Sequence, residues 1–182
     1  MFNKIKIPII NRFTCSTNQL PIFINNLKSK NFIPIIDHAN ENKIEWEKNY
    51  YNIINNLQKF KNSYFALKLS SLNIENNYEK ALELSNNICK KAKLNNCKIL
   101  VDAENYEIQE SINKISDILC KKFNNDNVNV YKTYQMYRKD SFDILKSDII
   151  KDRNYYLGIK LVRGAYYNQD KKFNILFNSI ND

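Results

Sequence analysis

Charged side chains stand near the ends of short apolar runs in this sequence. Lys68 lies inside the run Phe65–Leu69, and Asp102 and Glu104 close a run that begins at Lys98. A lysine within a buried parallel strand must find an anionic partner or lose its charge. The lysine and the carboxylates could therefore pair with each other or with a zwitterionic substrate. The alternative is an edge lysine that reaches water beside a solvated acidic turn.

Glycine is scarce. The chain has two glycines, Gly158 and Gly164, and both lie in its last strand-like segment. Gly164 lies just past an apolar run, where the backbone would take a positive φ or let a ligand come close. An ordinary strand-terminating turn is the alternative. So few glycines argue against the Gly-rich phosphate loops of Rossmann and P-loop proteins.

Strand-length apolar runs alternate with longer segments of helical periodicity, which is typical of repeated βα units around a parallel sheet. The runs lie about 25 to 35 residues apart, as crossover connections require. We predict five strands, at Phe32–Asp37, Ser63–Leu69, Lys98–Asp102, Val128–Tyr134 and Tyr156–Val162. Apolar residues at steps of three and four predict helices between them, over Ile44–Phe60, Tyr78–Asn95, Glu107–Phe123 and Ser141–Lys151. Asp140 or Ser141 can cap the last of these helices.

Strands of this kind build either an open doubly wound sheet or a (β/α)8 barrel, and in both the loops after the strands carry the chemistry. The lack of a Gly-rich fingerprint favours the barrel. About five βα units are present, so the predicted α/β fold is an incomplete, TIM-barrel-like (β/α)8 barrel. We expect one domain over residues 1–182, in which residues 1–30 form a lead-in segment.

The charge balance is basic, with 28 Lys and Arg against 19 Asp and Glu and a formal net charge of +9. The lysines are scattered and form no dense block, so we expect no nucleic-acid partner. The four cysteines lack the paired short spacing of a zinc site, and no metal is predicted. No apolar run approaches the ~20 residues of a membrane span. Residues 1–12 carry basic and no acidic side chains, which is compatible with a weak organelle-targeting segment.

Four segments together resemble the strand-end motifs of the proline dehydrogenase family, in the family's order and at similar spacing. They are Ala66–Leu72 (ALKLSSL), Leu100–Glu104 (LVDAE), Thr133–Tyr137 (TYQMY) and Lys160–Tyr166 (KLVRGAY). The segment Asp37–Glu41 resembles the family's first loop. The resemblance implies a distorted (β/α)8 barrel that holds FAD and oxidises L-proline to Δ1-pyrroline-5-carboxylate, with electrons passed to a quinone.

The same resemblance implies roles for individual side chains. Lys68 would pair with the substrate carboxylate, and Tyr166 would pack against the proline ring. Asp102 would join the hydrogen-bonded network around substrate and flavin, and Lys160 would stabilise the anionic reduced flavin from a position near N5. Lys132 stands where relatives often have Gln or Asn facing the flavin. The implied cofactor contacts are Ala103, Lys132, Lys160, Arg163, Gly164 and Ala165.

The chain is shorter than the family's barrel, which needs about three more βα units after Tyr166. Those units hold further FAD contacts and a helix whose paired arginines grip the proline carboxylate. Because an open partial barrel exposes sheet edges and apolar surface, we expect self-association or a completing chain.

Three readings stay open: an incomplete chain of an active proline dehydrogenase, a truncated and inactive relative, and an unrelated α/β binding domain. By the resemblance, a eukaryotic protein would lie in the mitochondrion. Otherwise we expect the cytoplasm or the membrane periphery.

Overall fold

The computed structural model describes residues 14–38 and 45–178, which belong to two compact units divided after Pro34. In the first unit, helix α1 spans Leu20–Ser29 and carries Pro21 in its first turn, where the missing N–H of proline costs no hydrogen bond. This helix was not predicted. Residues 1–13 of the predicted lead-in and residues 39–41 of the predicted first loop lie outside the described residues.

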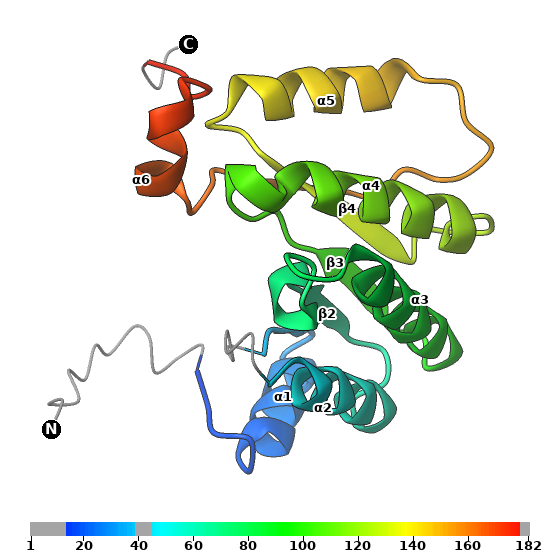
Figure 1. The fold of residues 1–182 in the computed structure, drawn as a ribbon. Coiled ribbons are helices and arrows are strands. Elements are labelled where there is room, and N and C mark those ends of the chain that lie inside the picture. The colour runs from blue at the N-terminus through cyan, green and yellow to red at the C-terminus, as the bar shows by residue number, and fades with distance from the viewer. Residues whose placement is uncertain (1–13, 39–44, 179–182) are drawn as a thin grey trace, which may run out of the picture. The chain divides into compact units, whose positions relative to one another are not determined.

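A parallel sheet of five strands forms the centre of the second unit. Its strands are β1 (Ile35–Ile36), β2 (Tyr64–Leu67), β3 (Lys98–Val101), β4 (Val130–Gln135) and β5 (Ile159–Val162), in that spatial order. Figure 1 labels the three central strands, β2, β3 and β4. Each strand pairs with the next one along the chain, which is the order of a barrel, whereas the order of a doubly wound sheet reverses. All five predicted strands are confirmed, and only β4 continues one residue past its predicted range.

Four helices connect the strands, as the apolar periodicity predicts. They are α2 (Trp46–Lys59), α3 (Tyr78–Leu94), α4 (Tyr106–Phe123) and α5 (Lys139–Ile150), with bounds within about two residues of the predicted ones. The predicted start at Ile44 lies outside the described residues. Three more short helices follow β2 and β5: η3 (Leu69–Leu72), α6 (Tyr167–Asp170) and η4 (Lys171–Phe173).

The N-terminal ends of the helices differ from the predicted capping. Asn77 and Asn105 cap α3 and α4, because their side-chain oxygens accept backbone N–H groups of the first turn. Helix α5 has no side-chain cap, so the prediction that Asp140 or Ser141 caps it is wrong. The Ser141 hydroxyl instead accepts a hydrogen bond from the backbone N–H of Gln135, at 2.9 Å.

Asparagine takes turn positions that glycine fills in most proteins. In the described part of the chain, asparagines with φ between +53° and +66° are Asn31, Asn62, Asn73, Asn96 and Asn174. Asparagine tolerates this left-handed backbone better than most residues with a Cβ atom. A chain with two glycines can therefore still make tight turns.

The hydrophobic core lies between the sheet and its helices. Alternate strand residues point toward α3, α4 and α5 and are buried there, namely Phe65, Leu67, Ile99, Val101 and Val130. The residues between them point to the opposite face of the sheet. In a closed (β/α)8 fold this second face is the interior of the barrel, so its polar side chains are the candidates for chemistry.

The sheet is not closed in the described part of the chain, because β1 and β5 form its two edges. This confirms the predicted incomplete barrel. Leu161 of β5 shares the helix-side face with the buried Tyr134, yet it is 58% exposed. None of the described helices has both the length and the apolar character that a membrane span requires.

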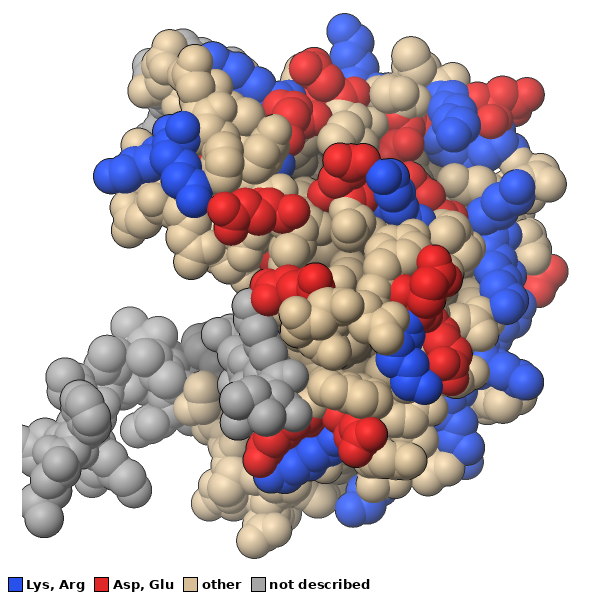
Figure 2. All heavy atoms as spheres, in the orientation of Figure 1, with Lys and Arg blue, Asp and Glu red and all other residues tan. Residues whose placement is uncertain are grey.

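Basic side chains are spread over the surface. Figure 2 shows lysine and arginine together with acidic side chains over the visible face. The last turns of α2, α3 and α4 all carry lysine. These lysines oppose the partial negative charge at helix C-termini, which gives part of the positive charge a structural reason.

Candidate active site

The register of the parallel strands places the predicted cations, Lys68 and Lys160, and the predicted acid, Asp102, in one row. Parallel pairing places Thr133 of β4 beside Lys160 of β5. When the β2–β3 and β3–β4 registers are continued by one residue, Lys68 lies beside Asp102, and Asp102 beside Thr133. Side chains paired in this way share a face of the sheet. The row therefore lies at the carboxyl ends of four strands, on the face opposite the helices.

Lys160 and Asp102 form an ion pair across β4. The Lys160 Nζ lies 2.6 Å from the Asp102 Oδ1, and both side chains are partly shielded from solvent. A charge-assisted hydrogen bond in such a place is stronger than one on an open surface. The sequence left it open whether Asp102 would pair with Lys68, and the structure pairs it with Lys160.

Lys68 has an anionic partner on the other side of the row. Its Nζ lies 3.0 Å from Oδ2 of Asp37, which follows β1. Asp37 is about half exposed, so this pair is closer to water than the pair of Lys160 with Asp102. The charged row thus runs from the end of β1 to β5, with two cations and two carboxylates in alternation.

Glu104 anchors the loop that follows β3. Its buried side chain accepts a hydrogen bond from the Ser70 N–H at 3.0 Å, and its backbone N–H donates to the Gln109 side chain at 2.8 Å. Burial raises the pKa of the Glu104 carboxyl above its usual value, although the hydrogen bond from Ser70 acts against this. Ala103, the other predicted residue of this loop, lies between Asp102 and Glu104 and is partly exposed.

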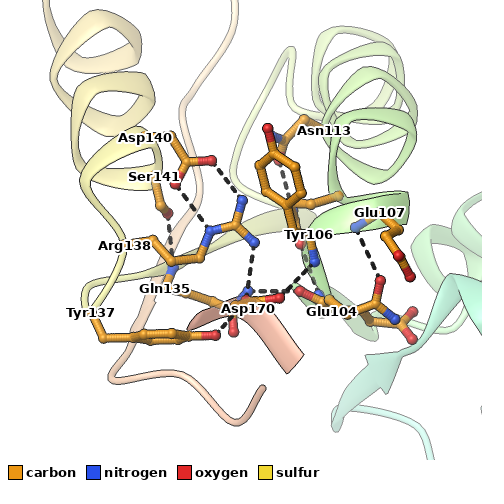
Figure 3. Close-up of polar contacts among 12 residues, drawn as sticks. Glu104, Tyr106, Glu107, Asn113, Gln135, Tyr137, Arg138, Asp140, Ser141 and Asp170 are labelled. Atoms are coloured by element: carbon orange, nitrogen blue, oxygen red, sulfur yellow. Dashed lines mark hydrogen bonds and ion pairs between the residues drawn. The ribbon is translucent and has the colours of Figure 1, made fainter. Parts of the chain in front are cut away.

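Gln135 was not singled out from the sequence, although it lies within the TYQMY motif. It follows Thr133 by two positions and therefore shares the face of the charged row. Its Nε2 donates to the backbone oxygen of Glu104 at 2.8 Å (Figure 3). This bond ties β4 to the loop after β3, next to Asp102.

Lys132 does not lie with the other predicted residues. Its side chain is only 3% exposed, and its Nζ contacts Asp117 of α4 at 2.7 Å and Asp148 of α5 at 2.9 Å. The Tyr134 hydroxyl also donates to Asp148, at 2.8 Å. Because side chains alternate along a strand, Lys132 and Tyr134 face the helices while Thr133 faces the row. The predicted flavin contact of Lys132 is therefore corrected to a buried contact between sheet and helices.

The charge of Lys132 is retained despite its burial. Burial by itself would lower the pKa of this lysine, but the contacts with Asp117 and Asp148 outweigh it and raise the pKa above the usual value. The ammonium group therefore holds α4 and α5 against β4 as a charged group.

The segment after β5 carries the remaining predicted residues. Arg163 and Ala165 are exposed, whereas Gly164 and Tyr166 are half-buried. Gly164 has φ +126°, and a Cβ atom at this position would overlap the ring of Tyr137. The glycine is thus required both by its backbone conformation and by close approach. The approaching group in this structure is a side chain of the same protein.

An open hollow of about 1130 Å³ borders the same segment. It is lined mainly by apolar and aromatic side chains, with Arg163 among the charged ones; the lining includes Met136, Tyr137, Phe142, Arg163, Gly164 and Tyr167. Ligand pockets span about 300–1,000 Å³, so the hollow is large enough to receive part of a cofactor.

Within the row, the Thr133 hydroxyl has no hydrogen-bond partner in the described part of the chain, although it is buried. Buried polar groups are nearly always paired in folded proteins. The row is therefore not optimised as a purely structural network, since an apolar side chain would fill the same place without an unpaired hydroxyl.

Comparisons with known proteins point to one family. The family model of proline dehydrogenase matches residues 24–175. Proline dehydrogenase 1, mitochondrial, of Drosophila melanogaster is 39% identical over 88 residues, which cover 47% of this chain and 13% of the fly protein. Hydroxyproline dehydrogenase of Xenopus laevis is 36% identical over 87 residues, which cover 47% of this chain and 19% of the frog protein.

Among solved structures, proline utilization A from Bdellovibrio bacteriovorus, inactivated by N-propargylglycine, superposes with a TM-score of 0.72 at 14% identity. The match covers 88% of this chain and 21% of that protein, so the chain spans about a fifth or less of the proteins named here. The structural likeness supports the barrel fold, and the family match extends over most of the sequence. This chain belongs to the proline dehydrogenase family.

Proposed function

We propose that this protein acts in proline catabolism as a proline dehydrogenase, oxidising L-proline to Δ1-pyrroline-5-carboxylate with FAD and passing the electrons to a quinone. The observation that carries the proposal is the charged row on the inner face of the sheet, with Lys160 paired to Asp102 at 2.6 Å. Lys68, Asp102 and Lys160 of the row belong to the ALKLSSL, LVDAE and KLVRGAY motifs, so these family motifs meet at one place in the fold.

The cationic side chains and backbone groups of the site fit a flavin. FAD would supply the acceptor for the hydride that leaves the ring carbon beside the proline nitrogen. Lys160 brings a cation to one end of the row, and Arg163 follows it on the exposed segment after β5; both would balance negative charge that develops at the cofactor. The hollow next to Arg163 and Gly164 offers space at the same end of the strands. Ala103, Gly164 and Ala165 would add backbone contacts.

Lys68 is the proposed anchor for the substrate carboxylate. Its ion pair with the half-exposed Asp37 keeps its ammonium group at the row. An incoming carboxylate would share or replace Asp37 as the anionic partner. Tyr166 would pack against the proline ring, and Asp102 would orient Lys160 through their hydrogen bond. The substrate is thereby held by charge at one end of the row and by an aromatic surface at the other.

The family match removes one of the three readings, because an unrelated α/β binding domain would not match over residues 24–175. A measurement of proline turnover distinguishes an active enzyme from an inactive relative. Several relatives carry the word mitochondrial in their names, and we propose the same compartment if this protein is eukaryotic.

The test is spectroscopic. The purified chain is incubated with FAD, freed of unbound cofactor and checked for a flavin spectrum, and L-proline is then added without oxygen. An active enzyme gives a yellow protein that bleaches with L-proline and keeps its colour with D-proline. Bound flavin that L-proline does not bleach identifies an inactive relative, and a folded protein that retains no flavin refutes the proposal.

The open edges of the sheet also lead us to propose self-association or a completing chain. Ile35 at the β1 edge and Leu161 on β5 are exposed apolar side chains on opposite edges of the sheet. Exposed parallel edges with apolar neighbours favour pairing with another chain. Light scattering coupled to size-exclusion chromatography measures this directly, and a monomer at all concentrations would contradict it.

A further inference from the structure

One buried carboxylate joins the loops that follow three strands. Asp170 is the last residue of α6 and is 0% exposed. Its Oδ1 accepts the backbone N–H of Tyr106 at 2.9 Å, and its Oδ2 accepts the Tyr137 hydroxyl at 2.6 Å (Figure 3). Tyr106 begins α4 after β3, and Tyr137 follows β4. The segment after β5 is thus bonded to the segments after β3 and β4.

Arg138 brings a positive charge to the same carboxylate. Its guanidinium is buried and donates two hydrogen bonds to Asp140, at 3.0 and 2.6 Å. The remaining Nη1 donates to Asp170 Oδ2 at 3.4 Å, and the guanidinium lies 5.2 Å from the centre of the Tyr106 ring. Removing one partner of a buried ion pair is strongly unfavourable. Arg138 therefore supplies a buried countercharge to the Asp170 carboxylate.

The same residue controls the position of the segment Arg163–Tyr166. The backbone N–H of Asp170 donates to the Tyr166 oxygen at 2.9 Å, which closes the turn that starts at Tyr166. At the other end, the ring of Tyr137 occupies the space beside Gly164, and the Tyr137 N–H donates to the Arg163 oxygen at 3.0 Å. The Asp170 carboxylate thus acts on Arg163 and Gly164 through Tyr137, and the Asp170 backbone closes the turn at Tyr166.

We infer that Asp170 is a positioning residue, which sets the segment Arg163–Tyr166 against the charged row through Tyr137 and Arg138. The inference deepens the proposed function and rests on it, because the ligand contacts of this segment belong to that proposal. A carboxylate suits the task, since it accepts an N–H, an O–H and a guanidinium at once. The partners lie 32 to 64 residues away along the chain, so the contact fixes tertiary and not local structure.

The helix side of the sheet offers a matched control. Asp148 also accepts a hydrogen bond from a buried cation, Lys132, and from a tyrosine hydroxyl, Tyr134. Asp148→Ala therefore removes the same kinds of contact, but on the face away from the row. Hydrogen exchange followed by mass spectrometry compares the two changes in the purified chain without any ligand.

We expect Asp170→Ala to speed amide exchange in residues 103–109 and 163–173 by about ten- to hundredfold, the factor for losing a hydrogen bond to a charged group. Asp148→Ala should instead speed exchange in α4 and α5 and leave residues 163–173 unchanged. Tyr137→Phe, which removes one hydroxyl, should show a smaller form of the Asp170→Ala pattern even if Asp170→Ala does not fold. Unchanged exchange in residues 163–173, or an equal rise in all segments for both aspartate changes, would overturn the inference.

A second measurement separates positioning from stability alone. In flavin-loaded protein, Asp170→Ala should raise the proline concentration needed for half-maximal flavin reduction, by about tenfold or more for a misplaced substrate contact. Asp148→Ala should leave this concentration unchanged, and Asp170→Asn, which keeps an acceptor for the Tyr106 N–H, should fall between Asp170→Ala and the wild type. If the wild-type chain binds no flavin, the proposed function fails, and the exchange data alone decide whether Asp170 positions the segment.

Discussion

Replacing Lys160 by methionine removes the cation at the end of the row while keeping most of the side-chain volume. Its Nζ forms a 2.6 Å contact with Asp102, and its side chain is 27% exposed. Removing a group that balances developing charge costs about 2.7–4 kcal/mol, or about 100- to 1000-fold in rate. Because solvent reaches part of this side chain, we take the lower end and expect flavin reduction to slow about 100-fold.

The assay is anaerobic stopped-flow reduction of the flavin-loaded protein over a range of L-proline concentrations. Lys160→Met should lower the limiting rate and change proline affinity little, because the charge acts on the reaction and not on the substrate carboxylate. Lys160→Arg should retain most of the rate, since it keeps the charge near Asp102.

Lys98→Met is the matched control. Lys98 lies on the same face of the sheet, at the amino end of β3, where its Nζ contacts Asn127 and Asn129. It is about 13 Å along the strand from Asp102, so its loss should leave the rate unchanged. Equal losses for Lys160→Met and Lys98→Met, or equal losses in rate and proline affinity for Lys160→Met, would show that Lys160 acts only through structure.

Four more changes test other parts of the structure. Lys132→Met leaves two carboxylates without their buried cation and should lower the free energy of unfolding in urea by about 3–5 kcal/mol. If the variant instead keeps its stability and loses flavin affinity, Lys132 contacts the flavin as the sequence predicts. Gly164→Ala should destabilise the protein by about 1–3 kcal/mol because of its positive φ, and further because the new Cβ atom overlaps the Tyr137 ring. In a Tyr137→Ala background the same change should cost less, and an equal cost in both backgrounds would mean that the ring is not the obstacle. Thr133→Val replaces an unpaired hydroxyl by a methyl group and should leave the melting temperature of the ligand-free chain unchanged or higher; a clear decrease would reveal a partner for the hydroxyl. Because the pKa of the Glu104 carboxyl is raised, the native state keeps the carboxyl proton to higher pH than the unfolded chain does. The stability that this carboxyl contributes is therefore full below about pH 4.5 and is lost as pH rises through the folded pKa. Glu104→Gln should flatten this decrease of stability with pH, and an unchanged pH profile of the variant would contradict the argument.

The five strands and the four helices between them could be predicted because each leaves a local signal. Runs such as Lys98–Val101 are apolar and of strand length, and the helix Glu107–Phe123 repeats its apolar residues every three to four positions. The caps left no such signal. Asn77 and Asn105 cap helices in a sequence where asparagine is common, so their presence at these two positions does not stand out.

The contacts of the site were predictable only in part, because they depend on which distant segments meet. The sequence could place Lys68 and Asp102 at strand ends, but their partners come from other strand units, Asp37 from the end of β1 and Lys160 from β5. The role of Asp170 left no signal at all, since it arises from a short helix after the last strand and its partners lie on two earlier loops. Such contacts form when distant segments of the chain pack together, and no local sequence pattern predicts them.

The error at Lys132 shows what register adds to a motif. Lys132 and Thr133 are neighbours in the sequence, yet the ladder pairs Lys132 with Ile159 and Thr133 with Lys160. A shift of one residue along a strand exchanges the two faces of the sheet, and β4 is buried on both sides, so its sequence shows no apolar alternation from which the faces could be assigned. Two lysines on adjacent strands therefore lie on opposite faces of the sheet: Lys132 binds the helices to the sheet, and Lys160 pairs with Asp102 on the inner face, where we propose that the chemistry takes place.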